Sequence, residues 1–466
     1  MQIPILQGIY NDKEGFRTQY PINLIAEPKN TGINNGYLRV VDGIKHFMDG
    51  PGKERGGINW NNACYRVMGS KLIKVNSNGS YGVLGDVGNN SDNPVTLCYG
   101  FDRLAIASDL NLFYYNSSIG LVQVTDPDLG NVLDVIWVDG YFVCTDGEFI
   151  VVTELLDPLS VNNLKYGSSE ADPDPIVALL KVRNEICALN RHTIEYFDNV
   201  GGQFFPFNRI EGAQIPKGCI GTKACCVGEG VVFFVGGGIN EQCGVYLGNS
   251  GQAQKISTQE VDKLINEYSQ DVLAGIEIEY RKEDSHSFLY IHLPSKTLLF
   301  DIGASKELKG TPVWSILASD MNDSGYYARH FVWCYNKWLL GHSSLPSIGY
   351  LSKDTAKHWD AGIIWEFNTL IIYGEGKNAV FHKLELVTTA TQDSTKDSII
   401  STQYSNDGRS WSQLQSVVQK AGIPVKRKAW FRQGMLCHWR IQKFRGNAET
   451  IFSIARLEAD LELLAW

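Results

Sequence analysis

The sequence predicts an all-β protein: a β-propeller of about seven blades with an N-terminal extended arm and a C-terminal β-sandwich-like domain. Three observations lead to this prediction. A unit of apolar strands and tight polar turns recurs along the chain, its spacing matches one propeller blade, and the pattern changes after about residue 355. The predicted boundaries are residues 1–45 for the arm and ring-closing strand, 46–355 for the propeller and 356–466 for the sandwich-like domain.

The repeat starts near residue 60 and occurs seven times. Its strands are rich in Val, Ile, Tyr, Phe and Cys, and they are often apolar on both faces, as expected where each blade packs between two neighbours. Successive first turns are 33 to 55 residues apart and fall near Gly69, Asp102, Asp139, Asn184, Glu229, Asp284 and Asn336. Two stacked β-sandwiches share short strands and turn signals, so they stay as the alternative architecture.

Two segments depart from the repeat. The stretch "INLIAEPKNTGINNGYLRVVDGI", residues 22–44, has paired apolar residues, prolines and a central run of turn formers, which indicates an extended arm. The stretch "STQEVDKLINEYSQ", residues 257–270, predicts a helix inserted on a blade. It opens with a capping box of Ser257 and Glu260, and one face carries Val261, Leu264, Ile265 and Tyr268.

Charge is unevenly distributed. The net charge is −9, which argues against general affinity for nucleic acid, yet residues 408–447 contain nine Lys and Arg and no Asp or Glu, so the rest of the chain carries −18 (−9 minus +9). Within this region Trp430 and Phe431 are interleaved with four basic residues that form a candidate basic patch: Lys426, Arg427, Lys428 and Arg432. Such a patch suits a phosphate backbone or stacked bases, and the alternatives are a solvated strand face or contact with an acidic neighbouring subunit.

No catalytic, cofactor or metal site is predicted. The chain has no phosphate-binding loop, no His-x-x-x-His pair and no Gly-x-Ser-x-Gly elbow, and its ten cysteines include no Cys-x-x-Cys pair, so reduced thiols are expected. Glu277 and Glu279 share one strand face, which we expect to be exposed. Propellers do host glycosidases, so a carbohydrate-binding or glycan-hydrolysing propeller remains the alternative function. No apolar run is long enough for a membrane helix.

Several stretches, in the same order along the chain, carry a family resemblance. They are the arm, with "PINLIAEPK" and "GYLR", then "YRVMGSKLIKV", "HTIEYFDN", "GVYLGNSGQAQKIST", "VDKLINEYS" and "DSHSFLYIHLPSKTLLFD". The chain resembles the packaged-DNA stabilisation proteins of short-tailed phages, the tail accessory factors or tail hubs of the Salmonella-type group. The resemblance implies a non-enzymatic part of the virion tail, assembled in the host bacterial cytoplasm.

The resemblance also implies partners. These are a homohexameric ring of the chain itself, a portal and adaptor above it, a tail needle, tailspikes and non-specific contact with packaged DNA, without a membrane or a cofactor. The basic patch would line the channel or face the adaptor. For the arm, we expect Tyr37, Leu38 and Val40 to add a strand to the last blade and close the ring, with residues before Pro21 reaching a neighbouring subunit. The carbohydrate alternative instead predicts aromatic and carboxylate side chains clustered on the propeller axis.

Overall fold

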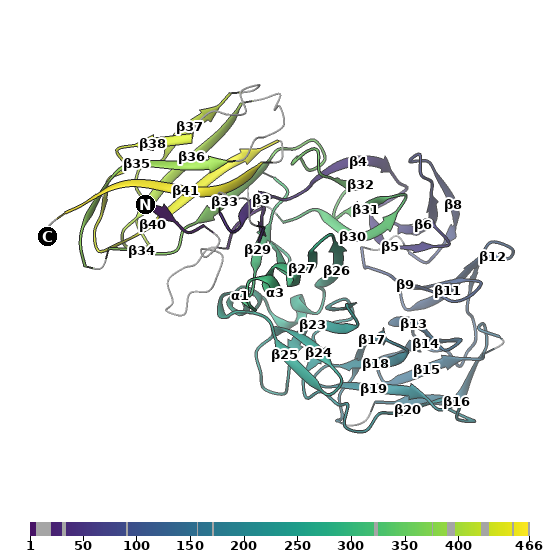
Figure 1. The fold of residues 1–466 in the computed structure, drawn as a ribbon. Coiled ribbons are helices and arrows are strands. Elements are labelled where there is room, and N and C mark those ends of the chain that lie inside the picture. The colour runs from purple at the N-terminus through teal and green to yellow at the C-terminus, as the bar shows by residue number, and fades with distance from the viewer. Residues whose placement is uncertain are drawn as a thin grey trace.

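The computed structural model describes residues 1–5, 20–29, 34–89, 92–155, 157–169, 172–320, 325–374, 376–388, 397–420, 428–449 and 452–464. A propeller and a sandwich lie side by side, and both ends of the described chain lie in the sandwich (Figure 1). The predicted all-β fold class is confirmed, and each of the seven predicted repeat units falls in a separate blade.

The described residues form seven antiparallel blade sheets. Blade 1 consists of β5 (Glu54–Trp60), β6 (Ala63–Met68), β7 (Lys71–Val75) and β8 (Tyr81–Asp86). Blade 2 consists of β9 (Thr96–Tyr99), β10 (Leu104–Ser108), β11 (Asn111–Asn116) and β12 (Gly120–Gln123). Blade 3 consists of β13 (Asp134–Val138), β14 (Tyr141–Thr145), β15 (Phe149–Thr153) and β16 (Val161–Ser168). In blades 4 and 5 the strands are β17 (Ile176–Val182), β18 (Glu185–Asn190), β19 (Ile194–Asn199), β20 (Phe207–Arg209); β21 (Gly218–Cys219), β22 (Cys225–Gly228), β23 (Val231–Gly237), β24 (Gly244–Asn249) and β25 (Gln252–Lys255). In blades 6 and 7 they are β26 (Glu277–Glu283), β27 (His286–His292), β28 (Thr297–Asp301), β29 (Trp314–Leu317); β30 (Ala328–Cys334), β31 (Lys337–His342), β32 (Ser347–Ser352) and β4 (Gly43–Asp49).

The ring closes through its innermost strands and through one strand from the N-terminal region. The innermost strands β5, β9, β13, β17, β22, β26 and β30 contact one another in turn, and β30 returns to β5. Blade 7 takes its outer strand, β4, from the segment that precedes blade 1, with Met48 opposite Ile348 and Ile44 opposite Leu351. This pairing joins the two ends of the propeller within one blade, which leaves the ring without an open seam.

The prediction that Tyr37, Leu38 and Val40 complete the last blade is wrong. These residues belong to β3 (Tyr37–Val40), which pairs with β2 (Leu24–Glu27) and with β41 (Ser453–Leu463) of the sandwich. The inward side chains of β3, Leu38 and Val40, are fully buried in the core that includes the sandwich residues Ile454 and Leu457. The seven-residue strand β4 follows and supplies the blade pairing that β3 was expected to make.

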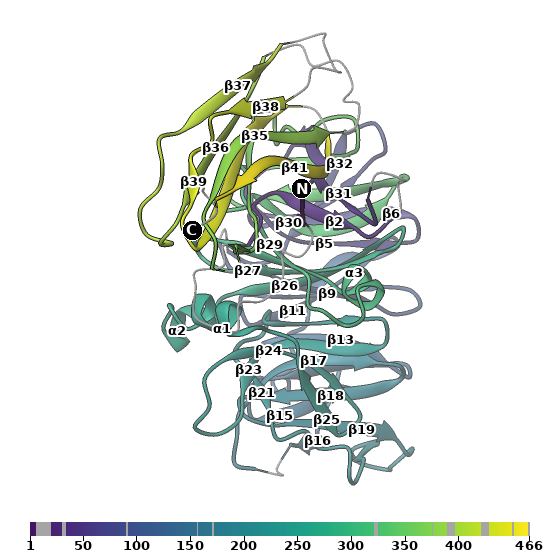
Figure 2. The same ribbon diagram turned by 60° about the vertical axis from the view of Figure 1, so that its left-hand side comes forward.

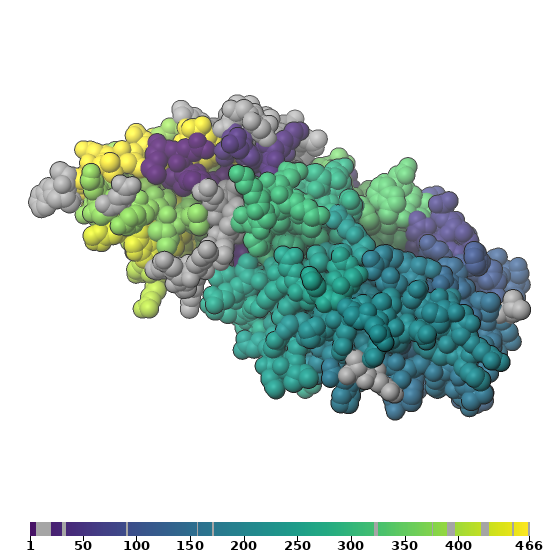
Figure 3. Space-filling model, turned by 60° about the horizontal axis from the view of Figure 1, so that its bottom comes forward, coloured from purple at the N-terminus to yellow at the C-terminus, as the bar shows by residue number. Residues whose placement is uncertain are grey.

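The sandwich combines strands from both ends of the chain. Its first sheet runs β2-β3-β41-β35-β38, with β1 on β41 and β39 on β35, where β1 is Gln2–Ile3, β35 is Ala379–Thr388, β38 is Lys428–Phe431 and β39 is Met435–Leu436. Its second sheet runs β33-β40-β36-β37, with β34 on β40, where β33 is Ile363–Asn368, β34 is Ile372–Tyr373, β36 is Ser398–Ser405, β37 is Gln415–Gln419 and β40 is Trp439–Ala448. Figure 3 shows N-terminal residues lying across the C-terminal sandwich.

The described residues contain three short helices, α1 (Gln259–Ile265), α2 (Gln270–Leu273) and α3 (Ile302–Glu307). Helix α1 confirms the predicted insertion, and its Val261 and Ile265 are buried against blade 5. The predicted cap is wrong by one residue, because Thr258 accepts the hydrogen bond from the backbone N–H of Val261. The Ser257 hydroxyl is used elsewhere: it accepts from the N–H of Val245 at 3.1 Å and donates to Asp262 at 2.6 Å.

Candidate functional site

The arm joins the propeller to the sandwich at Asn23. Its left-handed backbone, with φ of 54°, places this residue between blade 6 and β33. Its side-chain amide donates to the carbonyl oxygens of Ala318 at 2.9 Å and Ile364 at 2.7 Å, and accepts from the Ala318 N–H at 3.0 Å. The side chain is fully buried, so these bonds have no competing water. One residue thereby satisfies backbone groups of both domains.

Backbone bonds on either side of Asn23 extend the junction. Ile22 exchanges N–H···O bonds with Glu366 of β33 at 2.9 and 3.2 Å, and Ile316 of β29 donates to Pro21 at 2.9 Å. The apolar core is continuous across the junction, since one cluster contains Phe288 of blade 6 together with Trp365 of the sandwich. Figure 2 shows β2 between the sandwich and the blades. The two domains are therefore held as one block.

A second contact holds the arm to blade 6. His286 lies between Asp301, whose carboxylate is 2.5 Å from Nδ1, and Glu27 of β2, whose carboxylate is 3.0 Å from Nε2. Burial alone would lower the pKa of His286, but hydrogen bonds to these two carboxylates raise it to about 9. The imidazole is therefore a cation at neutral pH, and it links the arm electrostatically to the propeller.

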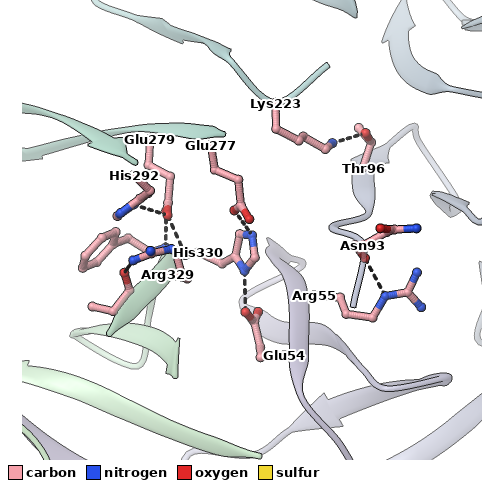
Figure 4. Close-up of polar contacts among 12 residues, drawn as sticks. Glu54, Arg55, Asn93, Thr96, Lys223, Glu277, Glu279, His292, Arg329 and His330 are labelled. Atoms are coloured by element: carbon pink, nitrogen blue, oxygen red, sulfur yellow. Dashed lines mark hydrogen bonds and ion pairs between the residues drawn. The ribbon is translucent and has the colours of Figure 1, made fainter. Parts of the chain in front are cut away.

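The centre of the ring at blades 6, 7 and 1 is filled by a buried ion-pair network. Figure 4 shows His330 of β30 between Glu54 of β5 and Glu277 of β26. Nε2 lies 2.8 Å from the Glu277 carboxylate, and Nδ1 bonds Glu54. Glu54 also binds the fully buried guanidinium of Arg66 at 2.7 Å. The network thus ties the first, sixth and seventh blades together across the point where β30 meets β5.

His330 reaches this position because β30 bulges. Its φ is 53°, and the pairing of β30 with β31 shifts register between Arg329 and Val332. The bulge frees two backbone N–H groups, of His330 and Phe331, and the carboxylate of Glu279 accepts both at 2.8 Å. Glu279 also lies 3.1 Å from Nε2 of His292. The same carboxylate therefore holds the irregular backbone in place.

The ionisation states follow from these partners. Burial would raise the pKa of Glu277, but the His330 cation beside it lowers that pKa to about 2. Burial would lower the pKa of His330, and the charges of Glu54 and Glu277 instead hold it well above its ordinary value. Burial, with the nearby Arg329 guanidinium, lowers the pKa of His292 to about 4, so that ring is neutral at pH 7.

The expectation that Glu277 and Glu279 form an exposed pair is wrong, since both side chains face inward to this network. They do not suit glycoside hydrolysis either. That reaction needs one carboxyl kept protonated by a raised pKa, whereas the pKa of both residues is lowered. Strand alternation correctly places the two glutamates on one face. No pattern in the sequence indicates Glu54 or His330, and Asn23 is marked only as a polar residue between Ile22 and Leu24.

The structure separates the predicted basic patch. Lys428 on β38 is only 3% exposed, and its Nζ donates to the Thr388 hydroxyl at 2.5 Å. Because the side chain is buried, the prediction of an outward-facing charge at Lys428 is wrong. The same burial lowers the pKa of its ammonium. The alternation of β38 explains this, because Trp430 also points into the core. Arg432 is exposed, whereas Lys426 and Arg427 lie outside the described residues.

Within the described ranges, no group of three or more His, Cys, Asp or Glu side chains is arranged to hold a metal ion. Among the described helices, none has the length and apolar character that a membrane crossing requires.

The closed propeller with its salt-bridged centre is joined to a sandwich through a shared core, which makes the chain an all-β protein of two packed domains. The family model described as the β-propeller of bacteriophage P22 Gp10 matches residues 1–356, and the model described as the β-sandwich of the same protein matches residues 364–462. The chain belongs to this family of structural phage tail hub proteins, which are components of the virion tail.

A curated relative agrees with this assignment. The tail hub protein gp10 of Salmonella phage P22 is 28% identical over 383 residues, which cover 77% of this chain and 78% of the relative. Two solved structures are also similar in shape. The Pan2 WD40 domain of Neurospora crassa has 7% identity and a TM-score of 0.43, covering 66% of this chain and 94% of that one. Virginiamycin B lyase of Staphylococcus aureus has 11% identity and a TM-score of 0.43, covering 64% and 94%.

Proposed function

We propose that this chain is the subunit of a homohexameric hub that docks below the portal and its adaptor. In this role the ring extends the DNA channel, helps to close it on the packaged DNA, and provides the platform for the tail needle and tailspikes. The role is structural, and no turnover is assigned to the chain. Family membership supports the general role, while the hexamer and the individual partners are part of the proposal.

The observation that carries the proposal is the junction at Asn23. A hub has to hold several neighbours at fixed positions, and that requires a subunit whose domains do not move relative to each other. Here a buried amide bonds both domains and one apolar core crosses between them. Interfaces between independently moving domains are usually smaller and more polar. The rigid two-domain block is therefore suited to an assembly platform.

The test is reconstitution. The full chain is mixed with the portal and adaptor complex of its own phage, and stoichiometry is measured by native mass spectrometry and cryo-EM. We expect six copies in a ring on the adaptor side, and the same mixture without the adaptor should show no ring on the portal. A chain that stays unbound, or binds with another stoichiometry, contradicts the proposal.

A further inference from the structure

The centre of the ring is hollow at blades 2 to 5, in contrast to the salt-bridged half. A cavity of about 480 Å³ lies between the innermost strands of these blades, with Ile58 of blade 1 at its margin. Pockets for small molecules generally enclose about 300 to 1,000 Å³. Neither the proposed hub role nor the family assignment uses this cavity.

Two lysines present ammonium groups to the cavity. Lys223, just before β22, crosses the ring from blade 5 to blade 2 and donates to the hydroxyl of Thr96 (Figure 4). Thr96 in turn donates to Asp134 at 2.6 Å. The Asp134 carboxylate is already occupied, since it also accepts the N–H groups of Val135 at 3.1 Å and Leu179 at 2.9 Å.

Neither cavity lysine is paired with a carboxylate within ion-pair distance, in the part of the chain that the structure describes. Lys223 donates one of its three N–H bonds to Thr96, which leaves two for a ligand. Lys181 of β17 places its ammonium 4.7 Å from the centre of the Trp137 ring, a cation–π contact that leaves its own N–H donors unused. The cavity therefore carries a local positive charge inside an acidic protein.

Aromatic rings lie at the other end of the cavity. Thr96 and Asp134 mark the starts of β9 and β13, whereas Trp137 is near the end of β13 and contacts Phe101, which follows β9. Phe101 stands edge-on to Trp137 with ring centres 5.3 Å apart, and its side chain is 88% exposed. Phe101 does not itself line the cavity, and the aromatic surfaces that face a ligand there belong to Trp137 and Tyr99.

We propose that this cavity binds an acidic sugar, a hexose-sized ring that carries one carboxylate. The carboxylate would bind the Lys223 ammonium, and the hydroxyls of Thr96 and Thr222 would bond the sugar hydroxyls. At the other end of the cavity, the Trp137 ring with Lys181 beside it would cover an apolar face of the sugar. A nucleotide fits less well. The described residues that line the cavity include no arginine and no residue of a helix, the two features that commonly bind phosphate groups.

Titration calorimetry and saturation-transfer NMR on the full chain test this proposal, with D-glucuronate as the probe and D-glucose as the neutral control. We expect glucuronate to bind at least about tenfold more tightly than glucose, since a hydrogen bond to a charged group contributes about 1.5 to 3 kcal/mol. An oligosaccharide of four uronate residues distinguishes two sources of the ligand. If the tetrasaccharide binds, the natural ligand is the end of a glycan chain. If only the monosaccharide binds, the natural ligand is a free sugar acid.

Variants locate the site. Lys223→Met removes the charge that binds the carboxylate and keeps the apolar stem, so it should weaken glucuronate binding about tenfold or more. Lys181→Met removes the charge beside Trp137 at the other end of the cavity, and it should weaken binding by a smaller factor. Lys263→Met, the same change on an exposed face of α1, should leave it unaltered. Thermal unfolding of each variant shows whether the fold is intact. Equal affinity for glucuronate and glucose, or unchanged glucuronate affinity in the Lys223 variant, overturns the proposal. Reconstitution of the hub tests a different property, so the two proposals can fail independently.

Discussion

The propeller and the sandwich differ in where their strands come from. Six of the seven blades in the described chain consist of consecutive strands, whereas one sandwich sheet joins β1 to β3 from the N-terminal arm with strands that follow residue 378. Local pairing makes each of these six blades nearly independent of the chain ends, whereas the pairing of distant segments carries a larger loop-closure cost. We therefore expect the stability of the sandwich to depend on contacts of the arm, and the stability of the propeller to depend on the ion-pair network at its centre.

The largest effect should come from Asn23→Leu. This change leaves three buried backbone groups of Ala318 and Ile364 without partners and puts a branched side chain at a φ of 54°. Unpaired buried groups cost about 1 to 3 kcal/mol each, so we expect a loss of about 4 kcal/mol or more in the free energy of unfolding. Urea denaturation, followed separately in each domain, should show the sandwich unfolding first.

Asn62→Leu is the matched control, because Asn62 is exposed and has a φ of 59°. It isolates the cost of the backbone conformation, for which we expect about 1 kcal/mol. If both variants lose the same stability, the buried hydrogen bonds of Asn23 contribute nothing, and the junction does not distinguish the sandwich from the propeller.

Glu54→Gln should damage the propeller without affecting the junction. It removes one of the two carboxylates that balance His330 and leaves the Arg66 guanidinium buried without its counter-charge. Breaking a buried pair on one side typically costs about 3 to 5 kcal/mol, and we expect about 3 kcal/mol here. Glu148→Gln, at an exposed position, should change stability by less than about 0.5 kcal/mol. If the sandwich of the Glu54 variant unfolded before the propeller, the expectation that this network stabilises the propeller would be contradicted.

The His286 contact predicts a pH dependence of the arm. The pKa of His286 in the folded chain is about 9, above its unfolded value, so the protonated ring stabilises the fold fully below about pH 6.5. This stabilisation is lost as the pH rises through 9, and we expect about 2 kcal/mol less between pH 7 and pH 10. The measurement is the difference in unfolding free energy between the native chain and His286→Gln. A difference that is independent of pH would show that Glu27 and Asp301 do not bind a charged ring.

The difference between the propeller and the sandwich also explains which parts of the fold can be predicted from the sequence. The blades were predictable because a short unit repeats and its turns have recognisable residues, such as Asp139, Asp284 and Asn336, each with positive φ. The first blade was placed one strand late, since β5 contains Gly56 and Gly57 and does not show the apolar pattern, so Gly69 marks its second turn.

The strand pairing of the sandwich and the residues at the ring centre are harder to predict from the sequence, for a different reason. Periodicity indicates that β3 is a strand, but it carries no information on whether Leu38 meets blade 7 or the distant Ile454. His330 enters the ring centre only because β30 bulges, and nothing in the surrounding sequence signals the bulge. Polar residues within apolar runs, such as Asn23 and Glu279, were the available signal, and they mark both the junction and the network.

The smallest effect should come from Lys428→Met, which tests whether the sandwich presents a basic surface at this point. The ammonium is buried, and among the described residues it donates a side-chain hydrogen bond to the Thr388 hydroxyl and forms no ion pair. Replacing it by an apolar chain of similar length should therefore change stability by less than about 1 kcal/mol. The affinity of the Lys428→Met variant for non-specific duplex DNA should equal that of the native chain when both are measured by fluorescence anisotropy over a salt series. Arg432→Met is the matched exposed change, and it should lower the salt slope by about one if this face contacts phosphates. A weaker affinity in the Lys428 variant alone would mean that β38 turns this lysine outward on binding DNA, and the buried position of Lys428 would then not describe the bound state.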